Sequence, residues 1–302
     1  SFDLTPFTSP SRAQFWFEWR MYGRALPALV AILLPFELAM LYVMHDTPLL
    51  LFEIVVVILL SPPLMAAFVA PAVSSAMTPF IARRPLTGNA LIAAKLKTAL
   101  ASTLAAWVLV LVAMPVGLKI TGTAATVMEP VQRLADVIGM PRAVALVVVA
   151  LLFLMAATWK QLVQSLCIGM SGRPWITKGA VFATLAFISI AGLVSQWIVI
   201  DRRLGAVWKA APSIIFALAV LKLASAIWIF ARLRARGLMT DRALLLAAIA
   251  WDAAVFAVFA LLESLLPGLL VRGYFLLFVA ILAVPLVRLS AAPLAFAWNR
   301  NR

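Results

Sequence analysis

Metal ligands and nucleophiles are scarce in this sequence, which has one cysteine, Cys167, and one histidine, His45. A single cysteine excludes an internal disulfide framework, and a single histidine leaves a His/Cys metal site without its usual ligands. No segment has the glycine pattern ending in Lys-Ser/Thr that cradles phosphate, and none has the nucleophile-elbow spacing of serine hydrolases. We therefore expect a non-catalytic chain that itself binds no cofactor and no metal.

Charged residues are also few, at 12% of the 302 residues, whereas 65% are hydrophobic and the mean hydropathy is +1.09. A helix needs about 20 apolar residues to cross the hydrocarbon core of a bilayer, and several runs reach that length. The sequence has no strong internal repeat and no linker long enough to separate domains. It therefore predicts an all-α polytopic membrane protein with a single transmembrane domain over residues 1–302.

Apolar runs separated by charged breaks predict about eight transmembrane helices. Their expected bounds are 24–44, 49–73, 98–118, 143–166, 179–200, 210–231, 243–265 and 269–288. The part from 179 to 231 is ambiguous, because the charged triplet Asp201-Arg202-Arg203 divides it and could begin a re-entrant or interfacial turn. Six or seven spans therefore stay open as alternatives.

Basic residues outnumber acidic residues by 25 to 11 and lie mainly between the spans. If the N-terminus is inside, the cytoplasmic segments hold 17 of the 25 basic residues, the outer segments hold seven, and Lys222 lies within a span. Cytoplasmic loops of membrane proteins carry such an excess of positive charge. The distribution predicts that both termini lie on the cytoplasmic side, N-in and C-in, with a cytoplasmic tail at 289–302. The basic residues of the chain then face anionic lipid rather than nucleic acid.

The first 23 residues contain an expected amphipathic helix. Ser9 followed by Pro10 is typical of a helix start. The next turns place aromatic residues on one face and polar residues off it, with Phe15, Trp19 and Tyr22 on the stripe and Gln14, Glu18 and Arg20 beside it. We expect this helix to lie in the cytoplasmic interface, or else to be the aromatic belt at the start of a span.

Ionisable residues inside the spans are candidates for function, because a charge near the bilayer centre costs roughly 2.5–3.5 kcal/mol and needs a partner. Lys222 and Asp252 lie ten residues from Arg232 and Arg242, on either side of one cytoplasmic turn. In antiparallel helices they reach the same depth, about 15 Å from that turn. We expect a buried ion pair, which is either a structural staple between two spans or a coupling element.

Glu37 and Glu53 have a similar symmetry, since each is eight residues from His45 in the next outer turn. These two carboxylates either face a cavity that accepts a cation or proton, or hydrogen-bond to neighbouring spans. Lys160, near the inner end of the fourth predicted span, is expected to extend toward the cytoplasmic headgroups.

One compact polar segment, residues 78–89 (TPFIARRPLTGN), separates the second and third predicted spans and leads into a helical run ending in Lys95 and Lys97. Residues 79–97 resemble the cytoplasmic segment between the second and third spans of permeases of the ABC-2 type, with its Arg-Pro-Leu/Val-Ser/Thr and Ala-Lys pattern. Residues 11–20 (SRAQFWFEWR) look like the connecting helix that precedes the first span in that family. The ending at 285–302 looks like that of some bacterial members.

The resemblance implies the membrane subunit of an ATP-binding cassette transporter, working as a homo- or heterodimer. ATP and Mg²⁺ would be bound by a separate cytoplasmic ATPase, which docks on a coupling helix between the second and third spans. Thr87 or Asn89 would cap that helix, and its basic side chains would meet acidic residues of the ATPase. Carried onto this sequence, the docking and coupling residues are Arg83, Arg84, Pro85, Leu86, Thr87, Asn89 and Lys95. The family usually has six spans.

Two other functions fit the residues. A proton- or ion-coupled secondary transporter would use Glu37, Glu53 and the pair of Lys222 and Asp252 without any ATPase. A structural subunit of a larger membrane complex would use the basic loops to bind partner subunits or anionic lipid. If the chain transports, its aliphatic and aromatic spans favour a lipidic or amphipathic cargo over a small ion.

Overall fold

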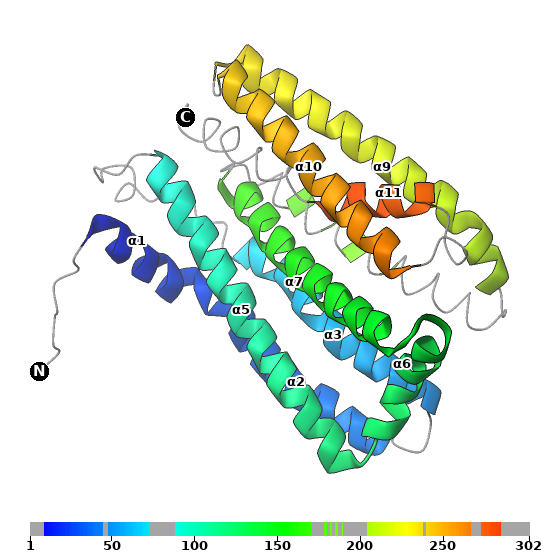
Figure 1. The fold of residues 1–302 in the computed structure, drawn as a ribbon. Coiled ribbons are helices and arrows are strands. Elements are labelled where there is room, and N and C mark those ends of the chain that lie inside the picture. The colour runs from blue at the N-terminus through cyan, green and yellow to red at the C-terminus, as the bar shows by residue number, and fades with distance from the viewer. Residues whose placement is uncertain are drawn as a thin grey trace, which may run out of the picture.

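The fold is known from a computed structural model that describes residues 9–44, 48–72, 88–170, 204–237, 240–266 and 273–284, with 178–179, 182, 185–186 and 189. Every element in this part of the chain is helical (Figure 1). Six of the described helical stretches are long and apolar enough to cross a membrane. The protein is therefore an all-α polytopic membrane protein, as the sequence predicts.

The described chain begins with one continuous helical stretch from Pro10 to Val43. It consists of α1 (Pro10–Glu18), the π-helical turn η1 (Trp19–Gly23) and α2 (Ala25–Val43). The Ser9 side chain caps α1 by accepting a hydrogen bond from the backbone N–H of Arg12, and Pro10 occupies the first turn. The expected helix start is confirmed, and the helix continues directly into the first span.

Four more helices complete an N-terminal group, which we define as α1 to α7. They are α3 (Pro48–Ala72), α5 (Gly88–Thr121), α6 (Ala124–Ile138) and α7 (Met140–Met170). Apolar side chains that recur along α2, α3, α5 and α7 pack into the larger core, whose buried members include Leu26, Val30, Leu34, Leu41, Leu51, Val55, Ile58, Ala106, Val110, Leu162 and Val163. This core holds the four long helices of the group together.

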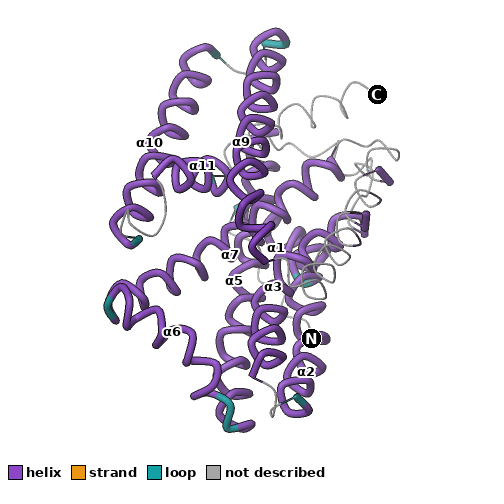
Figure 2. Tube along the Cα trace, turned by 90° about the vertical axis from the view of Figure 1, so that its right-hand side faces the viewer, coloured by secondary structure: helices purple, strands orange, loops and turns teal. Residues whose placement is uncertain are grey.

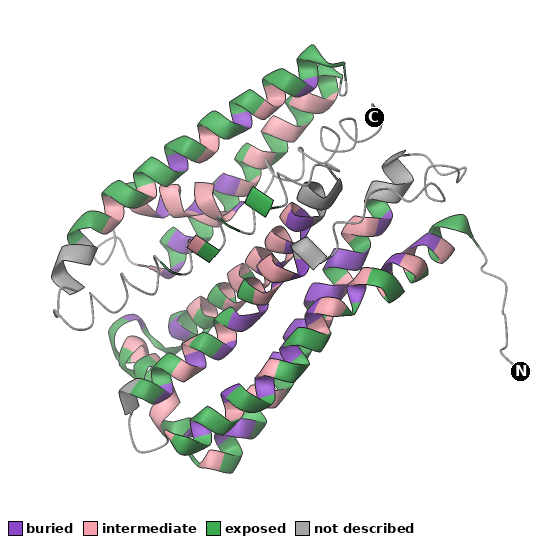
Figure 3. Ribbon diagram, turned by 180° about the vertical axis from the view of Figure 1, so that it is seen from behind, coloured by how far each residue is buried: buried purple, intermediate pink, exposed green. Residues whose placement is uncertain are grey.

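Three helices form a C-terminal group, α9 (Leu204–Ala235), α10 (Asp241–Leu265) and α11 (Gly273–Ala283). Its core cluster of buried apolar residues consists of Val255, Ala280 and Val284, with partly buried neighbours from α10 and α11. Exposed side chains predominate along α9 and α10 (Figure 3). Exposed apolar surface of this extent is expected where helices face lipid rather than water.

Helix α11 lies across α9 and α10 rather than alongside them, as both Figure 1 and Figure 2 show. It has 11 residues and is about 16 Å long at the α-helical rise, roughly half the thickness of a hydrocarbon core. The last predicted span, 269–288, therefore contains a described helix that ends at Ala283, before the predicted boundary. The fifth predicted span, 179–200, lies almost wholly outside the described residues.

Candidate functional site

A buried ion pair joins the N-terminal helix to α5. The Lys95 ammonium donates to a Glu18 carboxylate oxygen at 2.9 Å, and the two side chains are only 14% and 2% exposed. Gln14, one turn before Glu18, donates from its Nε2 to the other carboxylate oxygen at 2.8 Å. The Lys95 ammonium also lies 5.3 Å from the centre of the Tyr22 ring, within cation–π range. Each charge in this cluster therefore has a described partner.

The pair forms because the helices approach closely where η1 meets α5. Gly23 allows this approach, since a Cβ atom there would lie 2.9 Å from Cγ2 of Thr98. The π-helical turn η1 follows Glu18 directly. Turns of this kind interrupt the regular helical register and occur often at functional positions.

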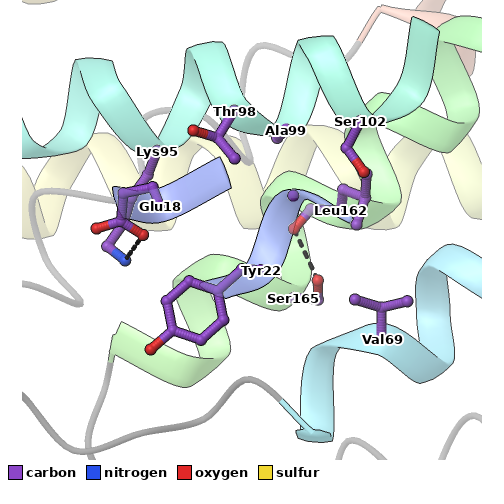
Figure 4. Close-up of a pocket in the computed structure, with 10 residues that line it drawn as sticks. Glu18, Tyr22, Val69, Lys95, Thr98, Ala99, Ser102, Leu162 and Ser165 are labelled. Carbon is purple, nitrogen blue, oxygen red and sulfur yellow. Dashed lines mark hydrogen bonds and ion pairs between the residues drawn. The ribbon is translucent and has the colours of Figure 1, made fainter. Parts of the chain in front are cut away.

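A small cavity of about 30 Å³ lies beside the ion pair, between η1, α3, α5 and α7. Figure 4 shows Thr98 and Ser102 projecting from α5, with Ser165 of α7 and Val69 of α3 opposite. The hydroxyl groups of Thr98 and Ser102 are buried and have no hydrogen-bond partner among the described residues. A site of this size and polarity has room for a water molecule, which would satisfy such hydroxyls.

A wider basic cleft, of about 420 Å³, lies between the start of α1 and α5. Its lining includes Arg12 and Lys97, together with Ser9, Ser11, Phe15, Ala93 and Ala94. Both cationic residues are exposed. The N-terminal part of α5 thus carries a largely buried cation, Lys95, and an exposed cation, Lys97, two residues later.

Most of the predicted docking residues lie outside the described part of the chain. This applies to Arg83, Arg84, Pro85, Leu86 and Thr87. Asn89 lies in the first turn of α5, which begins at Gly88, and Lys95 lies on the next turns of the same helix. The predicted helical run after the polar segment is therefore present, and it is continuous with the third span.

Two of the three polar residues predicted beside the aromatic stripe of the N-terminal helix are buried. Gln14 and Glu18 are each about 1% exposed, whereas the third, Arg20, is exposed. The reason is the partner on α5, since Lys95 makes burial of the Glu18 carboxylate favourable. Nothing in the sequence pairs residues 77 positions apart. The available signal was the i, i+4 spacing of Gln14 and Glu18 just before an apolar span.

The predicted ion pair between Lys222 and Asp252 is wrong. Lys222 on α9 instead donates to three backbone carbonyl oxygens at the end of α11, those of Ile281 at 2.6 Å, Leu282 at 2.9 Å and Val284 at 2.6 Å. Asp252 is exposed on α10. Equal depth on two helices does not place two side chains on facing sides, and α11 lies against α9 with the carbonyl groups of its last turn within reach of Lys222.

Two further donors reach the same end of α11. The Lys160 ammonium of α7 lies 3.5 Å from the carbonyl oxygen of Leu282, and the Trp251 indole N–H of α10 lies 3.5 Å from that of Val284. Lys160 thus points into the helix bundle as well, where the sequence predicted an extension toward the headgroups. Lysines from both helix groups meet at α11.

The two predicted cavity carboxylates are in different environments. Glu37 on α2 is buried and accepts a long hydrogen bond of 3.5 Å from the Ser61 hydroxyl of α3, while its second oxygen has no described partner. Glu53 on α3 is exposed. The structure therefore does not bring the two carboxylates together at one described site. For Glu37 it supports the alternative of hydrogen bonding to a neighbouring span.

The contacts described above join helices to one another. The described residues contain no group of three or more His, Cys, Asp and Glu side chains that could hold a metal ion. The Glu18 and Lys95 pair connects two helices, and the carbonyl cluster connects three helices to α11. No protein-family model, no curated protein and no solved structure matches this chain.

Proposed function

We propose that the chain is the permease subunit of an ATP-binding cassette transporter, and that it exports a lipidic or amphipathic substrate using ATP hydrolysed by a separate subunit. The observation that carries the proposal is the buried ion pair between Glu18 and Lys95. It links the two segments whose sequences resemble the connecting helix and the coupling segment of the ABC-2 family. These segments lie far apart in the sequence and in contact in the fold.

The ion pair suggests how movement would pass into the membrane. The segment at residues 79–97 would receive the motion of the ATPase, and it runs directly into α5, a helix of 34 residues. A rigid helix transmits displacement along its length, and closing two ATPase subunits would move two such segments. The ion pair would pass the same displacement to α1 and, through η1, to α2. Two spans would thus respond to one docking surface.

The charges near the start of α5 support docking of an acidic partner. Arg12 and Lys97 line an open cleft on α1 and α5, and Arg83 and Arg84 lie just upstream of α5 in the sequence. Complementary charge increases the rate and specificity of association between proteins. We propose that the ATPase binds residues 83–89 of the predicted segment, that Lys95 pairs with Glu18 rather than with the ATPase, and that anionic lipid headgroups occupy the adjacent basic surface.

The proposal also includes a location and a partner for the chain. It would lie in a bacterial inner membrane with both termini in the cytoplasm and would work beside a second permease copy, identical or different. Large exposed apolar surfaces on α9 and α10 are compatible with lipid and with such a partner. ATP and Mg²⁺ would be held by the ATPase, so this chain would itself have no catalytic residue.

Affinity purification in mild detergent tests the docking. The wild-type chain should retain an ATP-hydrolysing partner, and the double variant Arg83→Glu with Arg84→Glu should lose it. Arg234→Glu with Arg236→Glu is the matched control, because it reverses two charges in another predicted cytoplasmic turn. Retention of the ATPase by the first double variant, or equal loss from both, would refute docking at this segment.

A further inference from the structure

The carboxyl end of α11 contacts one ammonium group through three backbone carbonyl groups. Three backbone carbonyl oxygens lie 2.6 Å, 2.9 Å and 2.6 Å from the Lys222 nitrogen. A lysine ammonium has three N–H donors, and charge-assisted hydrogen bonds have this length. The three carbonyl groups therefore match the three donors in number.

The carbonyl group of Ile281 is open to a side-chain donor because of how α11 ends. The backbone N–H of Val284 bonds to the carbonyl of Ala280 at 3.2 Å, which is the last turn of the helix. The next residue in the sequence is Pro285, which has no N–H to donate to the carbonyl of Ile281 four residues earlier. The carboxyl end of a helix also carries about half a negative charge from the aligned peptide dipoles. A cation is the natural complement of this end.

Two more donors surround the same carbonyl groups. Lys160 approaches Leu282 from α7 and Trp251 approaches Val284 from α10, each at 3.5 Å. Three helices therefore direct donors at the end of the fourth. Helices that stop inside a membrane bundle use their carboxyl-end carbonyl groups to coordinate cations, and rings of carbonyl oxygens replace the hydration shell of K⁺ in channels.

We propose that the carboxyl end of α11 is a monovalent-cation site and that the ammonium of Lys222 is the ion that fills it. The site should favour ammonium and small primary alkylammonium ions, which donate hydrogen bonds to several oxygen atoms at such distances. It should also favour K⁺, which several oxygen atoms coordinate. In the intact protein the tethered ion fixes α11 to α9. The Lys222 contacts join α9 to α11, away from the predicted docking segment, so the site would exist whether or not an ATPase binds the chain.

Chemical rescue tests the site. Lys222→Ala removes the tethered ion and leaves space for a free one, and Lys209→Ala on the same helix is the control because Lys209 is exposed. Thermal unfolding is followed in detergent with chloride salts of ammonium, methylammonium, potassium, sodium or choline at equal ionic strength. In choline chloride, the Tm of Lys222→Ala should be several degrees below the Tm of the wild type. Ammonium or methylammonium should restore at least half of that loss and should leave Lys209→Ala unchanged.

Two results of that experiment would overturn the proposal. One is an unchanged Tm of Lys222→Ala in choline. The other is a lowered Tm that ammonium, methylammonium and potassium shift no more than they shift Lys209→Ala, which would leave Lys222 as a tether with no cation site behind it.

The wild-type protein provides a second test if Lys222→Ala does not fold. A small uncharged amine-reactive ester is added in mild detergent, and the modified lysines are located by peptide mass spectrometry. Lys222 should react roughly tenfold or more slowly than Lys209, since its hydrogen bonds must break first, and the rates should become equal in strong denaturing detergent. Equal rates in the folded protein would contradict the proposal.

Discussion

The two helix groups are held together in different ways. In the N-terminal group, the larger apolar core packs α2, α3, α5 and α7, and the ion pair of Glu18 and Lys95 adds a polar contact at its edge. In the C-terminal group, the apolar core consists of Val255, Ala280 and Val284, and the cap on α11 is supplied by a lysine. Within a bilayer, apolar contact alone gives little preference for one neighbour over another. Polar contacts therefore specify more of the C-terminal arrangement than of the N-terminal one.

Removing the lysine cap should produce the largest effect. Lys222→Met keeps an apolar chain of similar length but removes three donors, so we expect the free energy of unfolding to fall by roughly 3 kcal/mol. Asp252→Leu should be close to neutral, because Asp252 is exposed and makes no contact with Lys222. Denaturant titration of both single variants and the double variant measures this. A double variant that is more stable than Lys222→Met alone by more than the effect of Asp252→Leu would indicate that the residues do interact.

Breaking the ion pair in the N-terminal group should have a smaller effect, because an apolar core remains around it. We expect Lys95→Met to lower the free energy of unfolding by about 2 kcal/mol, since the Glu18 carboxylate is left buried with a single side-chain donor. Lys97→Met, an exposed lysine on the same helix, is the matched control and should change it little. The reversed pair, Glu18→Lys with Lys95→Glu, should recover part of the loss. Equal effects of Lys95→Met and Lys97→Met would show that the pair is not structural.

Glu37 should contribute less still. The one described hydrogen bond that it accepts, from Ser61, is long, at 3.5 Å, so Glu37→Gln should change stability by under about 1 kcal/mol. Glu53→Gln, at an exposed position, should have no effect on stability.

Transport assays in vesicles with an imposed proton gradient distinguish a proton-coupled secondary transporter from an ATP-driven permease. Proton-driven uptake that disappears in Glu37→Gln would favour a secondary transporter over an ATP-driven permease.

The smallest effect is expected at the cavity hydroxyl groups. Thr98→Val and Ser102→Ala remove buried hydroxyls that have no described partner, and such changes are nearly neutral or stabilising when the shape is kept. Unfolding measurements on the two variants test this. A loss above about 1 kcal/mol would mean that a bound water or ligand satisfies these groups in the cavity.

The sequence was sufficient for the fold class and for most helix positions, because bilayer thickness imposes a length that can be counted. It was also sufficient for the capped start at Ser9 and Pro10. It was insufficient to predict which side chains contact each other across helices. The depth of a residue in the membrane can be counted along its helix, but the direction in which its side chain faces depends on the rotation of the helix, which the sequence does not specify. Lys222 was placed at the right depth and assigned to the wrong partner. Glu18 was placed on the polar side of an interfacial helix, whereas in the fold it is buried against Lys95, which lies far away in the sequence.

The central claim is that the ion pair of Glu18 and Lys95 couples the ATPase-docking segment to the membrane helices. ATP hydrolysis by the purified complex in lipid nanodiscs tests it, normalised to the amount of ATPase bound, in the wild type, Glu18→Gln, Lys95→Met and the double variant. We predict that all four retain the ATPase and that each single variant lowers hydrolysis as much as the double variant does. Equal hydrolysis in all four complexes, or a wild-type chain that binds no ATPase, would contradict the claim.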